Sequence, residues 1–461
     1  MGSKQKKKFK IDLKPTQILV LGFLLLIFVG AMLLNLPIAA TNHKSIGFID
    51  ALFTSTSAVC VTGLVVVNTL EYWSMFGKVV ILILIQIGGL GFMTFATTFF
   101  ILMGRKIRLK ERLIIQEALN QYTLSGMVRL TKNVLLGTLL IEGIGALLLS
   151  IRFVPEDGPY GIFKAIFHSV SAFCNAGFDI IGDSSLSPFV GDIIINVTIM
   201  LLIILGGLGF TVWIDILRVM KEKFNNKLGF KRTFRKFTLH TKIVIVLTTS
   251  LIIIGFIFFF IMETTNPNTL GQLSMKNKIL GSLFQAITPR TAGFNTIPLA
   301  EMTHGSKFMT IILMFIGGSP AGTAGGIKTV TMGVIILTVI SGVRGKEKTE
   351  AFNRTIPEVI IKRALAVIMI GISVVILVTM ILSVTEVGSF MDIFFEAVSA
   401  FATVGLTLGI TGSLTTIGKI VICITMFIGR LGPVTMAVAI SLKGTKSKAA
   451  ITKPEEKVMV G

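Results

Sequence analysis

Long apolar runs dominate this chain and limit the folds open to it. Residues 16–40 carry no charged side chain, and residues 239–262 carry a single one. About 20 helical residues cross the roughly 30 Å of hydrocarbon in a bilayer. Charged residues make up 15% of the chain, whereas an ordinary soluble domain has about 25%. These features exclude a soluble globular enzyme, a disordered chain and a coiled coil, and they predict a polytopic helical membrane protein.

The positive charge of the chain gathers in blocks. The net charge is +21, and most Lys and Arg residues lie at 1–14, 104–132, 218–242, 344–363 and 443–457. The alternate connections carry twelve acidic and eight basic residues. Because basic loops stay in the cytoplasm, we predict that both termini are cytoplasmic. The distribution indicates membrane topology rather than nucleic-acid binding, with contact to anionic membrane lipid as a secondary role.

Four segments of the chain repeat one pattern. Each ends in a glycine followed by a large apolar residue, and the glycines Gly63, Gly177, Gly293 and Gly405 are 114, 116 and 112 residues apart. A serine stands six residues before the glycine in three repeats, and Ile287 takes that place in the third. The segments read FIDALFTSTSAVCVTGL (48–64), IFKAIFHSVSAFCNAGF (162–178), ILGSLFQAITPRTAGF (279–294) and FMDIFFEAVSAFATVGL (390–406).

Each of these segments lies between two long apolar stretches and is itself too short to span a bilayer. The pattern predicts an all-α membrane protein with four membrane–pore–membrane repeats, eight spans in all, around one central ion pathway with four re-entrant pore loops. The predicted parts are a cytosolic N-terminus (1–15), repeat 1 (16–103), repeat 2 (127–217), repeat 3 (239–341), repeat 4 (359–441) and a cytosolic C-terminus (442–461).

The second apolar stretch of each repeat carries a glycine motif of its own. Small residues at such positions allow close helix approach or a break in the helix. We expect one clearly broken span, in the third repeat. The motifs are IGGLGF (87–92), LGGLGF (205–210), IGGSPAG (316–322) and IGRLGP (428–433).

Loops at membrane depth are tolerated where they line a watery cavity. Four such loops around one axis would present backbone carbonyls that replace the hydration shell of a cation, and glycine permits the dihedrals that this needs. Asp179 and Glu396 lie near the mouth and are expected to concentrate cations. An alternative is that the glycines serve helix packing alone. The side chains expected to support the loops are Thr62, Asn175, Thr291 and Thr403.

On these motifs the whole chain resembles the potassium transporter superfamily of the bacterial Trk and Ktr systems and the plant HKT proteins, most closely the Ktr membrane subunit of the KtrB or KtrD kind. Glycine in all four filter positions, Gly63 among them, goes with potassium in that family, whereas serine in the first goes with sodium. The resemblance implies a selectivity filter of Val61, Thr62, Gly63, Asn175, Ala176, Gly177, Thr291, Ala292, Gly293, Thr403, Val404 and Gly405.

The second stretch of repeat 3 departs from the others. It reads GGSPAGTAGGIKT (317–329), and Pro320 cannot donate a backbone hydrogen bond. We expect two half-helices, 306–316 and 327–341, joined beneath the filter by a loop over 317–326; a purely structural kink is the alternative. In the resembled family this is the intramembrane gate. The implied gate residues are Gly317, Gly318, Ser319, Pro320, Ala321, Gly322, Thr323, Ala324, Gly325, Gly326, Lys328 and Arg430.

Three basic residues fall at membrane depth, where a charge costs about 2.5–3.5 kcal/mol on insertion scales. Arg430 either faces the water-filled path as part of the gate or pairs with a buried acid or loop carbonyls. Lys328 either joins the gate or extends its ammonium toward the interface. Arg290 is expected to brace its pore loop or neighbouring acids rather than line the path.

Other polar residues in the spans offer less specific signals. Cys60 and Cys174 each lie three residues before a filter glycine, but the scattered histidines give no metal-ligand spacing. The chain therefore predicts no metal other than K⁺ at the filter. Glu142 and Asp215 favour hydrogen bonding between helices over a proton relay.

Together these features predict a non-enzymatic, potassium-translocating subunit. A sodium-conducting or Na/K cation transporter of the same fold is the main alternative, and a coupled transporter for another solute is disfavoured by the parallel repeats. The resemblance implies a bacterial plasma-membrane location, no covalently bound cofactor, a homodimer, and a cytosolic nucleotide-binding regulatory ring of the KtrA or KtrC kind as partner. It leaves open whether potassium flux is passive or depends on Na⁺.

Overall fold

The computed structural model describes residues 15–91, 113, 127–182, 184–227, 229–433 and 435–436. The predicted N-terminus up to residue 14, the end of repeat 1 from residue 92, most of the basic connection up to 126, and the tail from residue 437 lie outside the described residues.

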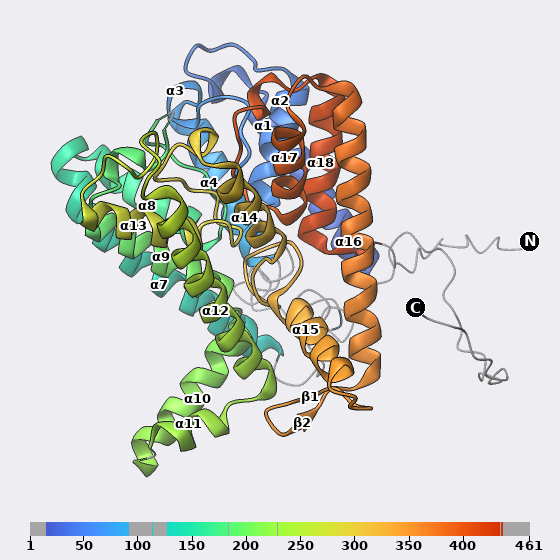
Figure 1. The fold of residues 1–461 in the computed structure, drawn as a ribbon. Coiled ribbons are helices and arrows are strands. Elements are labelled where there is room, and N and C mark those ends of the chain that lie inside the picture. Colours follow the sequence, from blue (N-terminus) through green and yellow to red (C-terminus); the bar gives the residue numbers. More distant parts are fainter. Residues whose placement is uncertain are drawn as a thin grey trace, which may run out of the picture.

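The described chain repeats one succession of elements four times (Figure 1). A long helix comes first, a short helix follows it, and a second helix returns. The long helices are α1 (Pro15–Leu34), α7 (Met127–Asp157), α12 (Leu239–Glu263) and α16 (Glu358–Thr385). The short helices are α2 (Phe48–Val59), α8 (Tyr160–Phe173), α13 (Met275–Ile287) and α17 (Phe390–Ala402). The returning helices are α4 (Met75–Leu90), α9 (Ile193–Gly207), α14 (His304–Phe315) and α18 (Thr416–Leu431).

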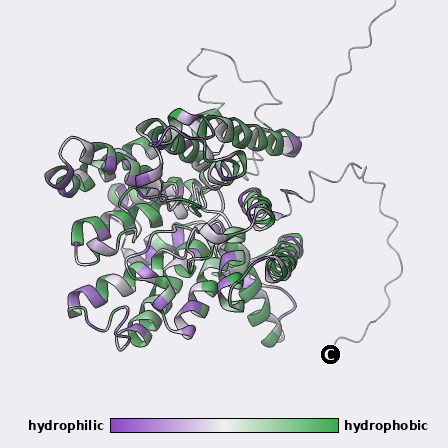
Figure 2. Ribbon diagram, turned by 90° about the horizontal axis from the view of Figure 1, so that it is seen from above, coloured by the Kyte–Doolittle hydropathy of each residue, from purple (hydrophilic) through white to green (hydrophobic). Residues whose placement is uncertain are grey.

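Within the described residues, four helices are long and apolar enough to cross a membrane, or five if the bent pair α9 and α10 (Phe210–Asn226) counts as one span. These four are the long first helices of the repeats. Their outward faces are apolar and exposed, as at Leu25, 62%, and Leu147, 70%. Figure 2 shows hydrophobic colour over most of the helical ribbon, with hydrophilic colour mainly at turns and helix ends. Lipid chains cover such faces in a membrane.

The short helices have the local signals of stable ends. Ser389 and Asp392 form a reciprocal capping box at the start of α17, and the hydroxyl of Ser274 accepts from Asn277 N at the start of α13. Each short helix packs against the long helix before it. Their inner ends are fully buried, so the chain that leaves each one enters the centre of the molecule.

The returning helices of repeats 1, 2 and 4 end beside equivalent glycines. α4 and α18 end at Gly91 and Gly432, with φ of 83° and 86°, and α10 begins after Gly209, with φ of 87°. Only glycine adopts this region readily. The prediction of a single broken span was therefore wrong: α9 and α10 meet at 99°, in addition to the break in repeat 3. In repeats 1, 2 and 4 the glycine before the last residue of the motif gives the backbone freedom for this turn.

At the end of the molecule opposite the short helices lie α10, α15 and the strand pair (Figure 1). β1 pairs antiparallel with β2, with Glu350 opposite Thr355. The elements of the described chain not yet named are α3 (Thr69–Tyr72), α11 (Phe230–Lys236), α15 (Thr329–Val343), β1 (Glu350–Ala351), β2 (Arg354–Thr355), and the 3₁₀ turns η1 (Pro37–Ala39), η2 (Ser187–Phe189), η3 (Leu299–Glu301) and η4 (Thr411–Ser413).

Candidate ion pathway

The four repeat glycines meet in a ring at the centre of the fold. A Cβ atom at Gly63 would lie 2.5 Å from the carbonyl oxygen of Ala176 and 3.0 Å from the Cα of Gly177. No side chain fits into such a gap. The carbonyl before each glycine therefore lies against the glycine of the neighbouring repeat. The same relation continues from Gly177 to Ala292, from Gly293 to Val404, and from Gly405 to Thr62, which closes the ring.

We call residues 61–63, 175–177, 291–293 and 403–405 the filter segments. Each has two residues with positive φ, the glycine and the residue two before it. In the first segment these are Val61, at 52°, and Gly63, at 91°. A non-glycine side chain is strained in this region, so the four-fold recurrence marks an enforced backbone path. The corresponding non-glycine residues are Asn175, Thr291 and Thr403, at 57°, 70° and 52°.

Serine side chains six residues before the glycine hold this path. The hydroxyl of Ser57 accepts from Gly63 N at 3.1 Å, and that of Ser399 accepts from Gly405 N at 3.1 Å. The hydroxyl of Ser171 instead donates to Phe178 O at 2.7 Å. These are buried backbone groups that would otherwise lack a partner. The sequence carried the signal, a serine repeated at one register, without showing its role.

The third repeat holds its filter segment without a serine at this position. Ile287 has no hydroxyl, and the next residue, Thr288, donates to Phe294 O at 2.5 Å. The N–H of Ala292 bonds to Thr288 O at 3.0 Å, one residue nearer than in the other repeats. A shift of one residue thus compensates for the missing serine.

The side chains expected to support the filter do so only in part. Asn175 donates at 3.4 Å to Arg290 O and to the hydroxyl of Thr291, both in the next repeat. The buried hydroxyls of Thr62 and Thr403 have no hydrogen-bond partner. The hydroxyls of Thr62 and Thr403 therefore give the loops no hydrogen bond, and any support from these two side chains comes from packing.

A cavity of about 400 Å³ opens beyond the ring on the side of the short-helix loops, and all four filter glycines line it. Asp179 also lines it, and burial raises the pKa of this carboxyl above its ordinary value. Glu396 lies just behind the wall, fully buried, where it accepts from the hydroxyls of Thr407 and Thr411 at 2.7 and 2.6 Å. Of the two predicted acids, Asp179 faces the mouth and Glu396 fastens the loop that surrounds it.

Residues 316–328, between α14 and α15, form an intramembrane loop below the ring. Its ends are held side by side by a parallel bridge between Ile316 and Ile327, with Gly317 N bonded to Ile327 O at 2.9 Å. A Cβ at Gly325 would meet the side chain of Thr403. The predicted half-helices are observed as α14 and α15, and the loop between them reaches the inner side of the filter.

The glycine motif of repeat 2 contacts this loop. Ser319 N donates to Gly207 O at 2.8 Å, and Phe210 N donates to Ala321 O at 2.9 Å. A Cβ at Gly209 would meet the carbonyl of Pro320. The LGGLGF motif therefore provides both the break between α9 and α10 and the seat of the loop.

Arg430 crosses from α18 to the loop. Its guanidinium donates to the carbonyl of Thr323, to that of Gly88, and to that of Gly89 at 3.0 Å. The structure thus gives it carbonyl partners rather than a carboxylate among the described contacts. Carbonyls at the end of α4 carry partial negative charge, which favours a cation.

The other two basic residues at this depth also bond within the protein. Lys328 donates to Ala324 O in the same loop at 2.6 Å, and its side chain is half-buried. Arg290 is buried and donates to the hydroxyl of Thr248, on α12, at 3.3 Å. Arg290 therefore braces its pore loop against a long helix, as expected.

Two acidic residues in or near the spans, Glu142 and Asp215, form hydrogen bonds between helices. Glu142 on α7 accepts from Gln86 on α4 at 3.1 Å, and Asp215 on α10 accepts from Thr238 N at 2.9 Å. Both contacts agree with interhelical hydrogen bonding. Among the described residues, no group of three or more His, Cys, Asp or Glu side chains could hold a metal ion, and Cys60 and Cys174 are buried free thiols.

Comparison with known proteins decides the family. The family model TrkH, described as a cation transport protein, matches residues 4–449. The chain belongs to the TrkH family. It is 46% identical over 448 residues to the Ktr system potassium uptake protein B of Bacillus subtilis, covering 97% of each chain. It is 42% identical to the potassium/sodium uptake protein NtpJ of Enterococcus hirae, covering 99% of each.

A solved structure has the same fold as this chain. The potassium transporter TrkH from Vibrio parahaemolyticus matches with a TM-score of 0.71, over 95% of this chain and 87% of that one, at 19% identity. The family match confirms the predicted superfamily and a membrane transport protein rather than an enzyme.

Proposed function

We propose that this chain takes up potassium as the ion-translocating subunit of a Ktr-type system. The observation that carries the proposal is the closed ring of Gly63, Gly177, Gly293 and Gly405, each against a carbonyl of the next repeat. A ring of carbonyl dipoles, one from each repeat, can replace part of the hydration shell of K⁺. The names of the relatives described above support potassium as the cargo.

The filter segments are proposed as the selectivity filter, and the intramembrane loop with Arg430 as the gate. The ring has uncharged side chains at its narrowest level, so selection rests on the backbone rather than on a ring of acids. The loop lies against Thr403 on the inner side. A cation that passes the filter would meet the loop and the guanidinium of Arg430, which repels it electrostatically.

The same family assignment supports a proposal for the assembly around the chain. We place the protein in the bacterial plasma membrane with both termini in the cytoplasm, as eight spans in four repeats with the boundaries predicted above. The basic connections at 104–132, 218–242 and 344–363 would contact a cytosolic nucleotide-binding ring, and two copies would form a homodimer. Figure 1 supports a shared contact surface for the second and third of these connections, because α10, α11, α15 and the strand pair gather at one end of the molecule.

The test is rubidium tracer uptake into proteoliposomes that contain this chain alone, driven by an internal potassium gradient. Uptake blocked by external potassium but not by sodium is the expected result. Equal competition by sodium would favour the alternative, a sodium-conducting or Na/K transporter of the same fold. The name of the Enterococcus hirae relative, which includes both ions, is the reason to measure this competition. Uptake that appears only after addition of a cytosolic ring would mean that the subunit is closed by itself.

A further inference from the structure

A second cavity lies away from the ion pathway, between α7 and the bend from α9 to α10. Its volume is about 230 Å³. Leu136 and Gly137 of α7 form one wall, Phe210 and Trp213 of α10 form the other, and Phe173 lies at its inner end. The 99° bend opens this space because α10 turns away instead of continuing along α7.

The mouth of the cavity faces the lipid. Leu136 is 55% exposed and Leu217 is 66% exposed, and both belong to its lining. Large apolar side chains at membrane depth are covered by hydrocarbon rather than by water. The cavity therefore opens toward acyl chains.

The lining of the cavity is almost entirely apolar. Apart from Asn133 and Thr138, its side chains are aliphatic or aromatic, with one glycine, and the hydroxyl of Thr138 is itself buried and does not reach the cavity. The space therefore suits an apolar chain rather than a polar ligand.

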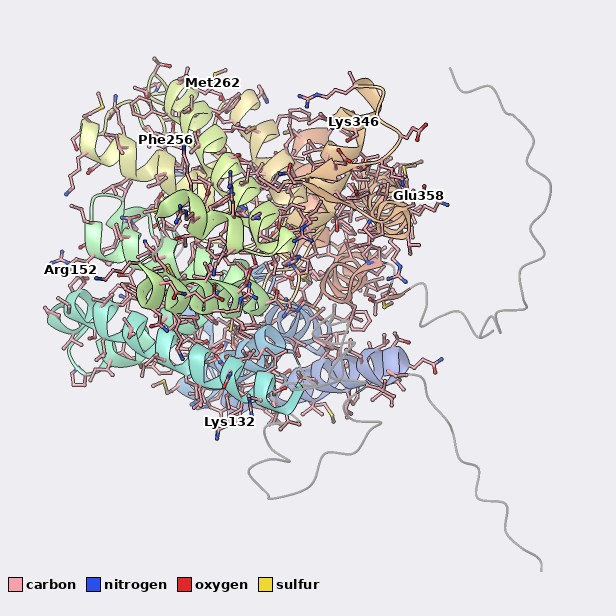
Figure 3. All side chains as sticks on the ribbon, turned by 90° about the horizontal axis from the view of Figure 1, so that it is seen from below. Lys132, Arg152, Phe256, Met262, Lys346 and Glu358 are labelled. Carbon is pink, nitrogen blue, oxygen red and sulfur yellow. The ribbon has the colours of Figure 1, made fainter. Side chains whose placement is uncertain are left out.

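Positive charge lies on the same helix face, one turn nearer the basic end of α7. Arg129 precedes the lining residue Asn133 by four residues, and Lys132 precedes Leu136 by four, which places them on neighbouring positions. Both side chains are exposed, and Lys132 points away from the bundle in Figure 3.

We propose that this cavity binds one acyl chain of an anionic phospholipid from the basic face of the membrane. Arg129 and Lys132 attract the headgroup, and the apolar lining of the cavity takes the acyl chain. The site also contacts the intramembrane loop: Phe173 O accepts from the hydroxyl of Thr323 at 3.0 Å, and Phe210 N donates to Ala321 O at 2.9 Å. The bound chain supports these two anchors and holds the loop in place.

Fluorescence tests the binding directly. The chain has two tryptophans, and Trp73 is buried elsewhere, so Trp73→Phe leaves Trp213 as the sole reporter in the cavity wall. Phospholipid brominated on its acyl chains quenches a tryptophan that it touches. We expect stronger quenching by brominated phosphatidylglycerol than by brominated phosphatidylcholine, and loss of this preference in Arg129→Gln/Lys132→Gln.

Substitutions at two glycines of α7 distinguish lipid bound in this cavity from ordinary surrounding lipid. A Cβ at Gly137 or at Gly143 meets nothing within 4 Å, and both lie on α7, but only Gly137 lines the cavity. Gly137→Leu should fill the cavity and reduce quenching at least twofold, whereas Gly143→Leu should leave it unchanged. Equal quenching in both variants would reduce the site to bulk lipid contact. Absence of quenching in the parent would mean that protein, from this chain or a second copy, fills the space.

Two further measurements keep the proposal testable. If Trp73→Phe does not fold, native mass spectrometry of the otherwise unchanged chain should show one fewer retained phosphatidylglycerol in Gly137→Leu than in Gly143→Leu; equal retention would overturn the site. The effect of the bound lipid on the intramembrane loop rests on the proposed gate. Uptake should then fall at least twofold as phosphatidylglycerol replaces phosphatidylcholine, except in Gly137→Leu. The binding measurements need no transport, so failure of the proposed function would be recognised separately.

Discussion

The guanidinium of Arg430 donates a hydrogen bond to the carbonyl oxygen of Thr323, 107 residues earlier in the chain. The same side chain reaches Gly88 and Gly89 at the end of α4. One residue of repeat 4 thereby ties the intramembrane loop of repeat 3 to repeat 1. Hydrogen bonds that involve a charged group contribute about 1.5–3 kcal/mol, which is enough to hold a short loop in one position.

Replacing Arg430 should release this loop. Arg430→Gln removes the charge and at least one of the three carbonyl contacts, so we expect rubidium uptake by the isolated subunit to rise about tenfold, the effect of about 1.4 kcal/mol. The measurement is initial tracer uptake at equal protein density. Arg344→Gln, which changes an exposed arginine at the end of α15, should leave uptake near the parent value. Unchanged or reduced uptake in Arg430→Gln would contradict a closing role.

A side chain at the first filter glycine should alter selectivity. In Gly63→Ser the new Cβ would lie 2.5 Å from Ala176 O on a backbone with φ of 91°, so the carbonyl must move. We expect sodium permeability relative to potassium to rise several-fold in ion-competition uptake. Gly47→Ser is the control, because Gly47 has φ of 94° but open space around its Cβ position. Equal permeability ratios in the two variants would refute the filter assignment.

The serine brace should matter for selectivity more than for folding. Ser57→Ala leaves the N–H of Gly63 unpaired, at a cost of about 1–3 kcal/mol, and lets the filter segment relax. Potassium-over-sodium preference should drop several-fold, with a modest fall in Tm. Ser55→Ala removes a different buried bond of the same helix, from the hydroxyl to Ile27 O at 2.7 Å, and should lower Tm without a change in preference. A matching loss of preference in both variants would mean that α2 as a whole is responsible.

External acid should weaken potassium capture through Asp179. Burial raises the pKa of this carboxyl, and the hydrogen bond from Ile181 N only partly offsets the effect. As the pH falls, Asp179 takes up a proton before an ordinary exposed carboxyl does, and the cavity above the ring loses negative charge. We expect KM for rubidium to rise about twofold between external pH 7.5 and 5.5. Asp179→Asn should show the higher KM at both pH values; a pH response that persists in this variant would assign it to another group.

Much of this fold could be predicted because its signals are local and repeated. Apolar length predicts the long helices, and the glycine motifs predict the filter segments and the loop of repeat 3. Breaks elsewhere were underestimated, since Gly209 and Gly432 within apolar runs also suit simple close packing. The positive φ of Gly209, 87°, accompanies the carbonyl of Pro320 packed against this glycine, a contact between residues far apart in the sequence.

The sequence by itself determined that four equivalent segments lie between long apolar stretches and end in glycine, because hydrophobic length and repeat spacing are properties of the chain alone. Only the tertiary structure decided which groups hold those segments. Ser57 braces the filter while the hydroxyl of Thr62 stays unpaired, and Arg430 selects Thr323 and Gly88 as partners. These choices depend on groups far apart in sequence that meet only when the four repeats close around one axis.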